Sequence, residues 1–236
     1  MSGTAAPRVV DDETLLLAEL VPLAGARVVD LGCGAADLSR RLLARGLVAS
    51  VDALEVDRVQ HARNLAAPAV RGLAFHEGGA DDIAFADGSF DVALMLKSLH
   101  HVPPARLDRA LDEVARVLRP GGWLWASEPV FAGDFNEIMR LFHDEQAARA
   151  AALDAIDRAL ARGRFEAIAR VHFVAPIAFR DFADFEARMM GVTHSALDRS
   201  PATVARVRER FEGHLGPGGA RFDRPMRVDL LRAIAP

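Results

Sequence analysis

The chain has 236 residues, of which 51% are hydrophobic and 26% charged, enough to bury the core of one large α/β domain. A formal net charge of -4 argues against nucleic acid or an anionic membrane surface as a partner. The single cysteine, Cys33, excludes an internal disulfide and a cysteine-based zinc site. The small, polar stretch Met1–Pro7 and the lack of an apolar run of about 18 residues predict a cytoplasmic protein without a signal peptide or a membrane span.

From Val28 onward, short apolar runs alternate with helical stretches, a pattern that predicts a doubly wound, mostly parallel sheet. The expected strands cover residues 27–31, 48–55, 73–76, 90–96, 123–127, 167–179 and 226–234. The expected helices cover residues 37–45, 105–118, 134–162, 181–190 and 201–214, with one more that begins after a capping Asp57. We therefore expect an α/β fold with a seven-stranded sheet in a single domain, residues 1–236.

The rhythm of the sequence changes after residue 130. We expect residues 1–130 to form a cofactor-binding core, and residues 131–164 and 181–215 to form helical lid insertions around the last two strands. Ligands of open α/β sheets bind outside the carboxyl ends of the strands, where such a lid would lie. Several aromatic rings are expected to pack the lid onto the domain, with stacking on an aromatic substrate as the alternative: Phe131, Phe135, Phe142, Phe179, Phe182 and Phe185.

The segment VVDLGCGAADLS, residues 28–39, places a glycine turn between a strand that carries an acid and a helix. Glycine is needed in such a turn because a Cβ atom would block positive φ angles and the close approach of a ligand. Asp37 stands where a dinucleotide fingerprint needs its third glycine, and its charge would face a pyrophosphate. A nicotinamide-dependent dehydrogenase is therefore disfavoured, whereas S-adenosyl-L-methionine, which has no phosphate, meets no such objection.

Four stretches in order carry a resemblance to a known family. They are the loop Asp30–Ala36, the acid that ends the second strand, GGADDIAFADGSFD at 78–91, and KSLHHVP at 97–103 followed by VARVLRPGGWL at 114–124. From about Val28 to Pro129 the chain resembles the class I S-adenosylmethionine-dependent methyltransferases, in particular the group of quinone-biosynthesis and other small-molecule enzymes. The resemblance implies a Rossmann-like fold, S-adenosyl-L-methionine as cofactor and S-adenosyl-L-homocysteine as product.

The resemblance also implies a set of cofactor-binding residues: Asp30, Gly32, Cys33, Gly34, Glu55, Val56, Ala80, Asp81 and Lys97. Glu55 ends the second strand and would accept hydrogen bonds from both ribose hydroxyls. Asp52 and Asp57 are the alternatives for this role, but Asp57 is well placed as a helix cap and Asp52 falls in mid-strand.

Ala80 and Asp81 are implied to contact the adenine edge, and Lys97 to stand beside the sulfonium. The sequence departs from the family pattern at two positions. Ala36 replaces the third glycine of the loop, and Gly79 stands where the family has the aspartate that contacts the adenine amino group. Lys97 is the only lysine among 29 basic residues, and its compact ammonium could balance a carboxylate of the cofactor or an acidic substrate group.

Candidates for a general base should follow the fourth and fifth strands, where they would face the methyl group. His100 and His101 follow the fourth strand, and Glu128 ends the fifth. We favour His101 as the base by a narrow margin over His100, and a structural role for either histidine is the alternative. Glu128 is a candidate for substrate contact as well as for catalysis.

Asn136 and His143 lie two turns apart in the expected helix 134–162 and would share one face. That face is a candidate substrate-binding surface, with an ordinary polar lid face as the alternative. His172 and His194 show no metal-ligand spacing, so no metal site is expected.

The predicted function is methyl transfer from S-adenosylmethionine to an oxygen, nitrogen or carbon atom of a small-molecule metabolite. The lid insertions favour a small substrate, and the absence of an Asn/Asp-Pro-Pro-Tyr stretch after the fourth strand disfavours an adenine amine. One alternative is a protein of the same fold that binds the cofactor for non-methylating chemistry or regulation. A protein or nucleic-acid methyltransferase is the other, and a homodimer remains open beside a monomer.

Overall fold

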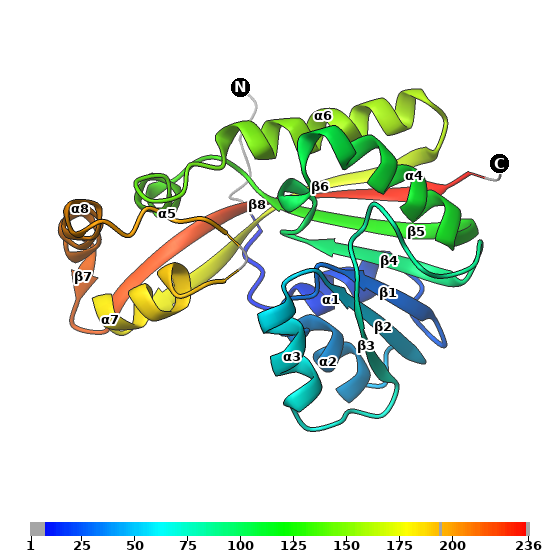
Figure 1. Cartoon of the computed structure of the whole chain (residues 1–236), viewed down its shortest axis with the longest axis horizontal. Helices are drawn as coiled ribbons and strands as arrows, with labels where there is room; N and C mark the ends of the chain where they lie inside the picture. The colour runs from blue at the N-terminus through cyan, green and yellow to red at the C-terminus, as the bar shows by residue number, and fades with distance from the viewer. Residues whose placement is uncertain (1–7, 194, 235–236) are drawn as a thin grey trace. The chain divides into compact units, whose positions relative to one another are not determined.

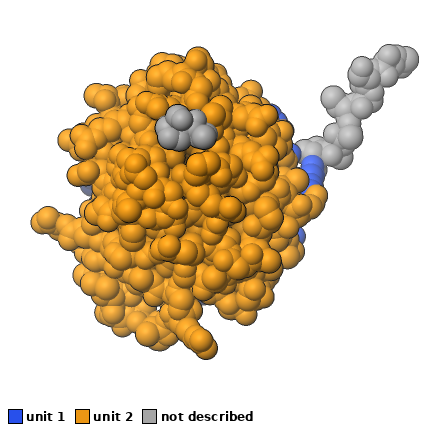
Figure 2. Space-filling model, turned by 90° about the vertical axis from the view of Figure 1, so that its right-hand side faces the viewer, with its two compact units in different colours: residues 1–11, 129–147, 172–226 blue, residues 12–128, 148–171, 227–236 orange. Residues whose placement is uncertain are grey.

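The computed structural model of the chain describes residues 8–193 and 195–234. The expectation of no signal peptide rests on Met1–Pro7, and the expectation of no metal site rests in part on His194. These residues lie outside the described ranges. The chain divides into two compact units, which Figure 2 colours separately. Unit 1 comprises Met1–Asp11, Pro129–Ala147 and His172–Met226, and unit 2 comprises Asp12–Glu128, Ala148–Val171 and Arg227–Pro236.

One sheet of eight strands has the order β3-β2-β1-β4-β5-β8-β6, with β7 paired to β8. Its strands are β1 (Arg27–Leu31), β2 (Ser50–Glu55), β3 (Leu73–Glu77), β4 (Phe90–Leu96), β5 (Leu118–Pro129), β6 (Phe165–Phe179), β7 (Leu215–Gly216) and β8 (Gly219–Ala233). The pairs β3-β2, β2-β1, β1-β4 and β4-β5 are parallel, and β7 runs antiparallel to β8. The prediction of a mostly parallel α/β sheet is confirmed, with the two-residue β7 as an eighth strand.

The helices of unit 2 cover both faces of its strands. They are α1 (Glu13–Leu20), α2 (Asp37–Ala44), α3 (Arg58–Ala66), α4 (Leu107–Val117) and most of α6 (Gln146–Ala161). Leu111 of α4 and Ile156 of α6 are buried in one apolar cluster with Val29 of β1. Asp30, whose side chain points to the opposite face because strand residues alternate, instead contacts Ser39 of α2.

The expected helix 134–162 is two helices in the structure, α5 (Asp134–Met139) and α6. The first predicted lid segment is divided accordingly, because residues 131–147 belong to unit 1 and residues 148–164 to unit 2. The second segment, residues 181–215, belongs to unit 1 and holds α7 (Phe182–Phe185), a π-helical turn (Glu186–Met190) and α8 (Pro201–Glu212). The role of both segments as a lid stays a prediction.

Unit 1 has an apolar core of its own. Its buried rings include five of the predicted phenylalanines and two others, namely Phe135, Phe142, Phe179, Phe182, Phe185, Phe211 and Phe222. The Phe185 ring is fully buried, with its centroid 5.0 Å from that of Phe211 and 5.1 Å from that of Phe179. These rings pack on one another and form the interior of unit 1.

Among the helices of the described ranges, none combines the length and the apolar composition that crossing a lipid bilayer requires.

Replacing Phe185 with alanine should destabilise unit 1 by about 3–5 kcal/mol, because the ring leaves a cavity in a packed core. Urea unfolding followed by circular dichroism gives the loss of stability, and hydrogen exchange locates it. We expect faster exchange in residues 201–212 and unchanged exchange in residues 92–96 of unit 2. Leu215→Ala, at a side chain that is 42% exposed, is the control; equal losses in both variants would contradict the assignment of Phe185 to this core.

Candidate functional site

The candidate site of unit 2 lies where parallel strands end. The turns after β1, β2 and β4 and the last residues of β5 share one edge of the sheet, because the four strands are parallel neighbours. All predicted cofactor-binding residues and the three predicted catalytic residues stand in the last residues of these strands, in the turns that follow them, or in the loop after β3.

The glycine turn after β1 requires its glycines for two different reasons. A Cβ atom on Gly32 (φ +71°) would lie 2.7 Å from the Cβ atom of Ser98, so only glycine fits where the two turns meet. Ser98 also donates its hydroxyl to the Leu31 carbonyl oxygen at 2.6 Å. A Cβ atom on Gly34 (φ +54°) would meet no atom within 4 Å, so the surface beside Gly34 is open to a ligand.

Glu55 joins the glycine turn to the end of β2. Its carboxylate, which is nearly buried, accepts the Gly34 N–H at 2.8 Å on one oxygen and the Asp57 N–H at 2.9 Å on the other. A carboxylate has about four acceptor positions, so two remain for hydroxyl donors. Asn64 of α3, which sequence reasoning missed, donates to the Gly34 carbonyl oxygen at 2.7 Å. Gln60 and His61 precede Asn64 on the same face of α3, so no sequence signal singled out Asn64.

The two alternatives to Glu55 have structural partners. Asp52 lies 2.8 Å from Nε2 of His76 on the neighbouring strand β3, and Asp57 caps α3 by accepting the Val59 N–H at 2.9 Å. These contacts leave Glu55 as the acid that reaches the glycine turn. Beside it, Val56 is 63% exposed and offers an apolar surface.

Asp30 is a buried carboxyl group behind the turn. Ser39 donates its hydroxyl to Asp30 at 2.5 Å. Burial raises the pKa of Asp30 to about 6, against the lowering effect of the Ser39 hydrogen bond and the Lys97 ammonium, and the Glu55 charge adds to the rise. Asp30 therefore changes its charge near neutral pH.

Lys97 and Cys33 stand close to this acid. Lys97 has a positive φ of +57°, a backbone conformation that is costly for a residue with a Cβ atom, and its N–H donates to the Ser127 carbonyl oxygen at 2.7 Å. Burial and the charges of Asp30 and Glu55 raise the pKa of the Cys33 thiol well above its ordinary value. Cys33 is thereby kept as an unreactive thiol.

The loop after β3 shows how the departure at position 79 is accommodated. A Cβ atom on Gly79 would lie 2.8 Å from Oδ1 of Asp81, so the glycine makes room for the Asp81 carboxylate. Arg106 donates to the other oxygen of Asp81 at 3.2 Å. Ala80 between them is buried. An aspartate at 79 and the observed position of Asp81 are therefore mutually exclusive.

The rest of this loop is held by α4. Arg116 donates to the carbonyl oxygens of Ile83 and Phe85, each at 2.8 Å, and Glu113 accepts the Ile83 N–H at 3.0 Å. The Arg116 guanidinium, through its hydrogen bond, holds the pKa of Glu113 below its usual value. Sequence reasoning missed both residues, because they support the backbone of a loop 30 residues away in the chain.

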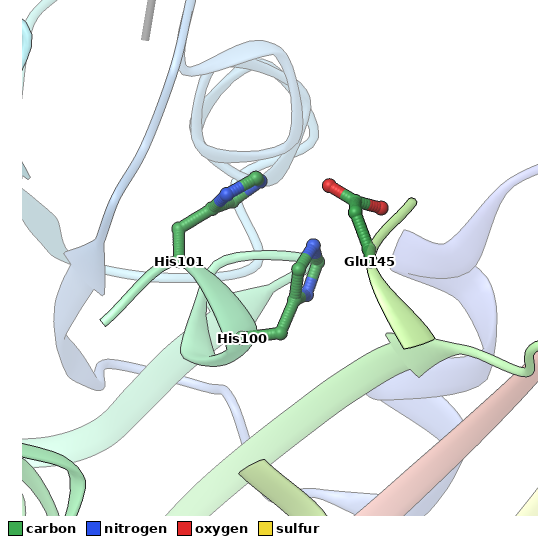
Figure 3. A group of neighbouring side chains, drawn as sticks. All are labelled: His100, His101 and Glu145. Atoms are coloured by element: carbon green, nitrogen blue, oxygen red, sulfur yellow. The ribbon is translucent and has the colours of Figure 1, made fainter. Parts of the chain in front are cut away.

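A buried carboxylate–imidazole pair connects the turn after β4 to the end of β5. Glu128 accepts the Leu99 N–H at 3.0 Å on one oxygen and binds Nδ1 of His100 with the other. Both side chains are almost fully buried, at 2% and 4% exposure. His101 is exposed, and its ring centroid lies 4.2 Å from that of His100 (Figure 3). Of the two histidines, His100 is therefore the one paired with Glu128.

The predicted substrate-binding residues of unit 1 do not share a helix face. Asn136 is buried in α5, but this helix ends at Met139. His143 lies beyond the turn that follows, with Nδ1 3.2 Å from a Glu145 oxygen. The prediction of a common face is therefore wrong, although each residue stays a candidate for substrate contact. His172 lies in β6, and the expectation of no metal site stays a prediction.

Residues 28–122 match a family model described as a methyltransferase domain. An uncharacterized methyltransferase of Mycobacterium tuberculosis is 41% identical over 105 residues, 44% of this chain and 40% of that protein. The ubiquinone biosynthesis O-methyltransferase of Thiobacillus denitrificans is 34% identical over 108 residues, 45% of each chain. The aligned segments thus span less than half the length of these relatives.

The fold is shared over almost the whole chain with solved structures. The cyclase SpnF superposes with a TM-score of 0.63 at 22% sequence identity, covering 96% of this chain and 81% of that protein. The family match falls on the strands and turns that hold the glycine loop, Glu55 and the His100 turn, and it confirms the resemblance on which the sequence-based prediction rested. Residues 28–122 are therefore similar to a methyltransferase domain, and the chain shares its fold with the solved structure of this cyclase.

Proposed function

We propose that this chain transfers the methyl group of S-adenosyl-L-methionine to a small-molecule metabolite and releases S-adenosyl-L-homocysteine. The observation that carries the proposal is the buried Glu55 carboxylate, which holds the Gly34 N–H inside a methyltransferase domain. The proposal includes a small-molecule partner and a cytoplasmic location, with no nucleic-acid or membrane partner. It leaves the choice between a monomer and a homodimer open.

The residues around the glycine turn suit this cofactor. The open surface at Gly34 admits a ligand against the backbone, Glu55 keeps acceptor positions for two ribose hydroxyls, and the exposed Val56 can cover an adenine face. Asp30 and Glu55 supply negative charge to a ligand that carries a sulfonium and an ammonium group. When bound, S-adenosylmethionine supplies an electrophilic methyl group on positively charged sulfur.

The acceptor chemistry follows from the His100–Glu128 pair. An imidazole whose Nδ1 binds a buried carboxylate is held in one tautomer, and the carboxylate stabilises the imidazolium once it has taken a proton. We propose that His100 accepts the proton of the acceptor as the acceptor atom bonds to the methyl carbon. His101, exposed beside it, is the second candidate for this role.

A hydroxyl group is the acceptor that most needs such a base, because its oxygen is a poor nucleophile while protonated. Among the oxygen, nitrogen and carbon acceptors expected from the sequence, we therefore place oxygen first. The name of the Thiobacillus denitrificans relative, an O-methyltransferase, supports this order.

Non-methylating chemistry on the same fold is the second candidate function. It is favoured by the likeness to the cyclase SpnF over 96% of this chain and by the Gly79 and Ala36 departures. A protein that binds S-adenosylmethionine but forms no S-adenosylhomocysteine with any acceptor would favour this second function.

Replacing Glu55 with glutamine should weaken S-adenosylmethionine binding by at least about tenfold, because charge-assisted hydrogen bonds contribute about 1.5–3 kcal/mol each. Titration calorimetry measures the dissociation constant, and circular dichroism checks the fold. Asp52→Asn, at the acid paired with His76, is the matched control and should bind within about twofold of the unsubstituted protein. Equal weakening in the two variants, or no binding by the unsubstituted protein at millimolar cofactor, would refute the assignment.

Cofactor affinity should rise as the pH is raised through about 6, by up to about tenfold per unit. Asp30 has a pKa raised to about 6, so it is neutral below this pH and anionic above it, and the anion favours a cationic ligand. Calorimetry between about pH 5 and about pH 7.5 measures the trend. Asp30→Asn should abolish it and Asp37→Asn, an exposed acid in the first turn of α2, should keep it; a trend that survives in Asp30→Asn would exclude Asp30 as its source.

Glu128→Gln should lower the rate of S-adenosylhomocysteine formation with hydroxylated acceptors by about 10²–10⁴-fold, because a glutamine cannot stabilise an imidazolium. Cofactor affinity should stay unchanged. A panel of phenols, alcohols and hydroxy acids, assayed by mass spectrometry, provides the acceptors. Glu77→Gln, at an exposed acid at the end of β3, is the control, and an unchanged rate in Glu128→Gln would remove the pair from the mechanism.

A further inference from the structure

Unit 1 contains a groove that the proposed function does not use. It has a volume of about 530 Å³ and is lined by Leu141, Arg206, Glu209, Arg210, Gly213 and His214. Leu141 follows α5, and the other residues belong to the second half of α8 and the turn after it; α5 and α8 are neighbours in unit 1 (Figure 1). All six residues belong to unit 1.

The polar residues of the groove follow the helical repeat. Arg206, Arg210 and His214 are spaced four residues apart, which places their side chains along one face of α8 and its continuation. The buried face of α8, with Val207 and Phe211, packs into the phenylalanine core instead. The groove is therefore a polar concavity whose wall is fixed by an apolar core behind it.

Among the described residues, the two groove arginines lack the carboxylate partner that several arginines of unit 1 have, a property they share with Arg199 and Arg221. Arg140, Arg188 and Arg208 each lie within 4.0 Å of a carboxylate of their own segment. Among residues 8–193 and 195–234, no carboxylate lies within this distance of Arg206 or Arg210. Hydrogen bonds from Thr203 and Ser200 hold the pKa of Asp198 below its ordinary value. The charge of Arg206 adds to this lowering from more than 4.0 Å away.

The C-terminal end of a helix carries a partial negative charge that attracts cations, and this effect explains the position of one of the two groove arginines. A cation in the last turn offsets the negative helix terminus, which accounts for Arg210. Arg206 stands six residues before the end of α8 at Glu212, too far from the helix end for that effect. The helix end also does not explain why these side chains line a groove. Glu209, also in the groove, opposes the arginines with one negative charge.

We propose that this groove binds a small oxyanion, a carboxylate or phosphate group, between the Arg206 and Arg210 guanidinium groups. Planar guanidinium donors match the geometry of such oxygens. His214 lines the same groove, and Glu209 can accept a hydrogen bond from a hydroxyl or amino group next to the anionic group. The ligand class is therefore a small anionic metabolite, and the site is independent of methyl transfer.

Titration of the full chain with inorganic phosphate and, separately, with citrate tests the proposal. Nuclear magnetic resonance of the arginine Nε–H groups reports binding at each guanidinium, at an ionic strength kept constant with sodium chloride so that screening does not change. We expect saturable shifts of Arg206 and Arg210 with one shared dissociation constant on the order of 1 mM. The two titrations show whether the groove takes phosphate, carboxylate or both, and saturation with either supports the proposal.

Three variants locate the site. Arg210→Gln should weaken binding by about tenfold, whereas Arg221→Gln, which removes the same charge from an exposed position of β8 in unit 1, should leave it unchanged. Glu209→Gln should tighten binding several-fold, a gain that misfolding cannot produce. Three outcomes would each overturn the proposal. They are shifts that saturate with neither anion, equal losses of affinity in Arg210→Gln and Arg221→Gln, and weaker binding in Glu209→Gln.

Discussion

The hydrogen bond between the Glu55 carboxylate and the Gly34 N–H is the contact on which the candidate site depends. It ties the turn after β1 to the end of β2, and the same carboxylate fixes the start of α3 through the Asp57 N–H. The turn can take this position only because Gly32 has no Cβ atom to strike Ser98. One glycine and one acid thus align the ends of three neighbouring strands, β2, β1 and β4.

The candidate site concentrates negative charge beside the glycine turn. Asp30 and Glu55 are both buried beside the turn, and the Glu55 charge disfavours ionisation of Asp30. Ser39 and Lys97 offset part of this cost, and Lys97 does so from a strained backbone conformation. The cost to local stability accompanies a negative electrostatic potential, as the proposed sulfonium ligand would require; strain of this kind is common at functional sites.

The two units use different means to hold their polar groups. In unit 2, buried polar side chains bind backbone groups of the turns, as Ser98, Asn64 and Glu128 do. In unit 1 the interior is a cluster of phenylalanine rings, and most polar groups stay at its surface. The first arrangement sets the geometry of the turns, whereas the second forms the apolar interior on which α8 packs.

The sequence by itself determined the order of most strands and helices and the position of the glycine turn, because alternation, helical periodicity and glycine spacing are local properties of the chain. It also placed Glu55, His100, His101 and Glu128 at strand ends. The glycine loop and the three stretches after it were sufficient to predict the resemblance to methyltransferases that the family match confirms.

Only the tertiary structure decided which of these side chains act together. Asp52 is paired through His76 on the next strand, and His100 rather than His101 meets Glu128, 28 residues away in sequence. Ser98, Asn64 and Arg116 acquired their roles from backbone groups of distant segments, and the break between α5 and α6 separated Asn136 from His143. Such contacts depend on how elements pack in three dimensions, and spacing along a single chain carries no signal for them.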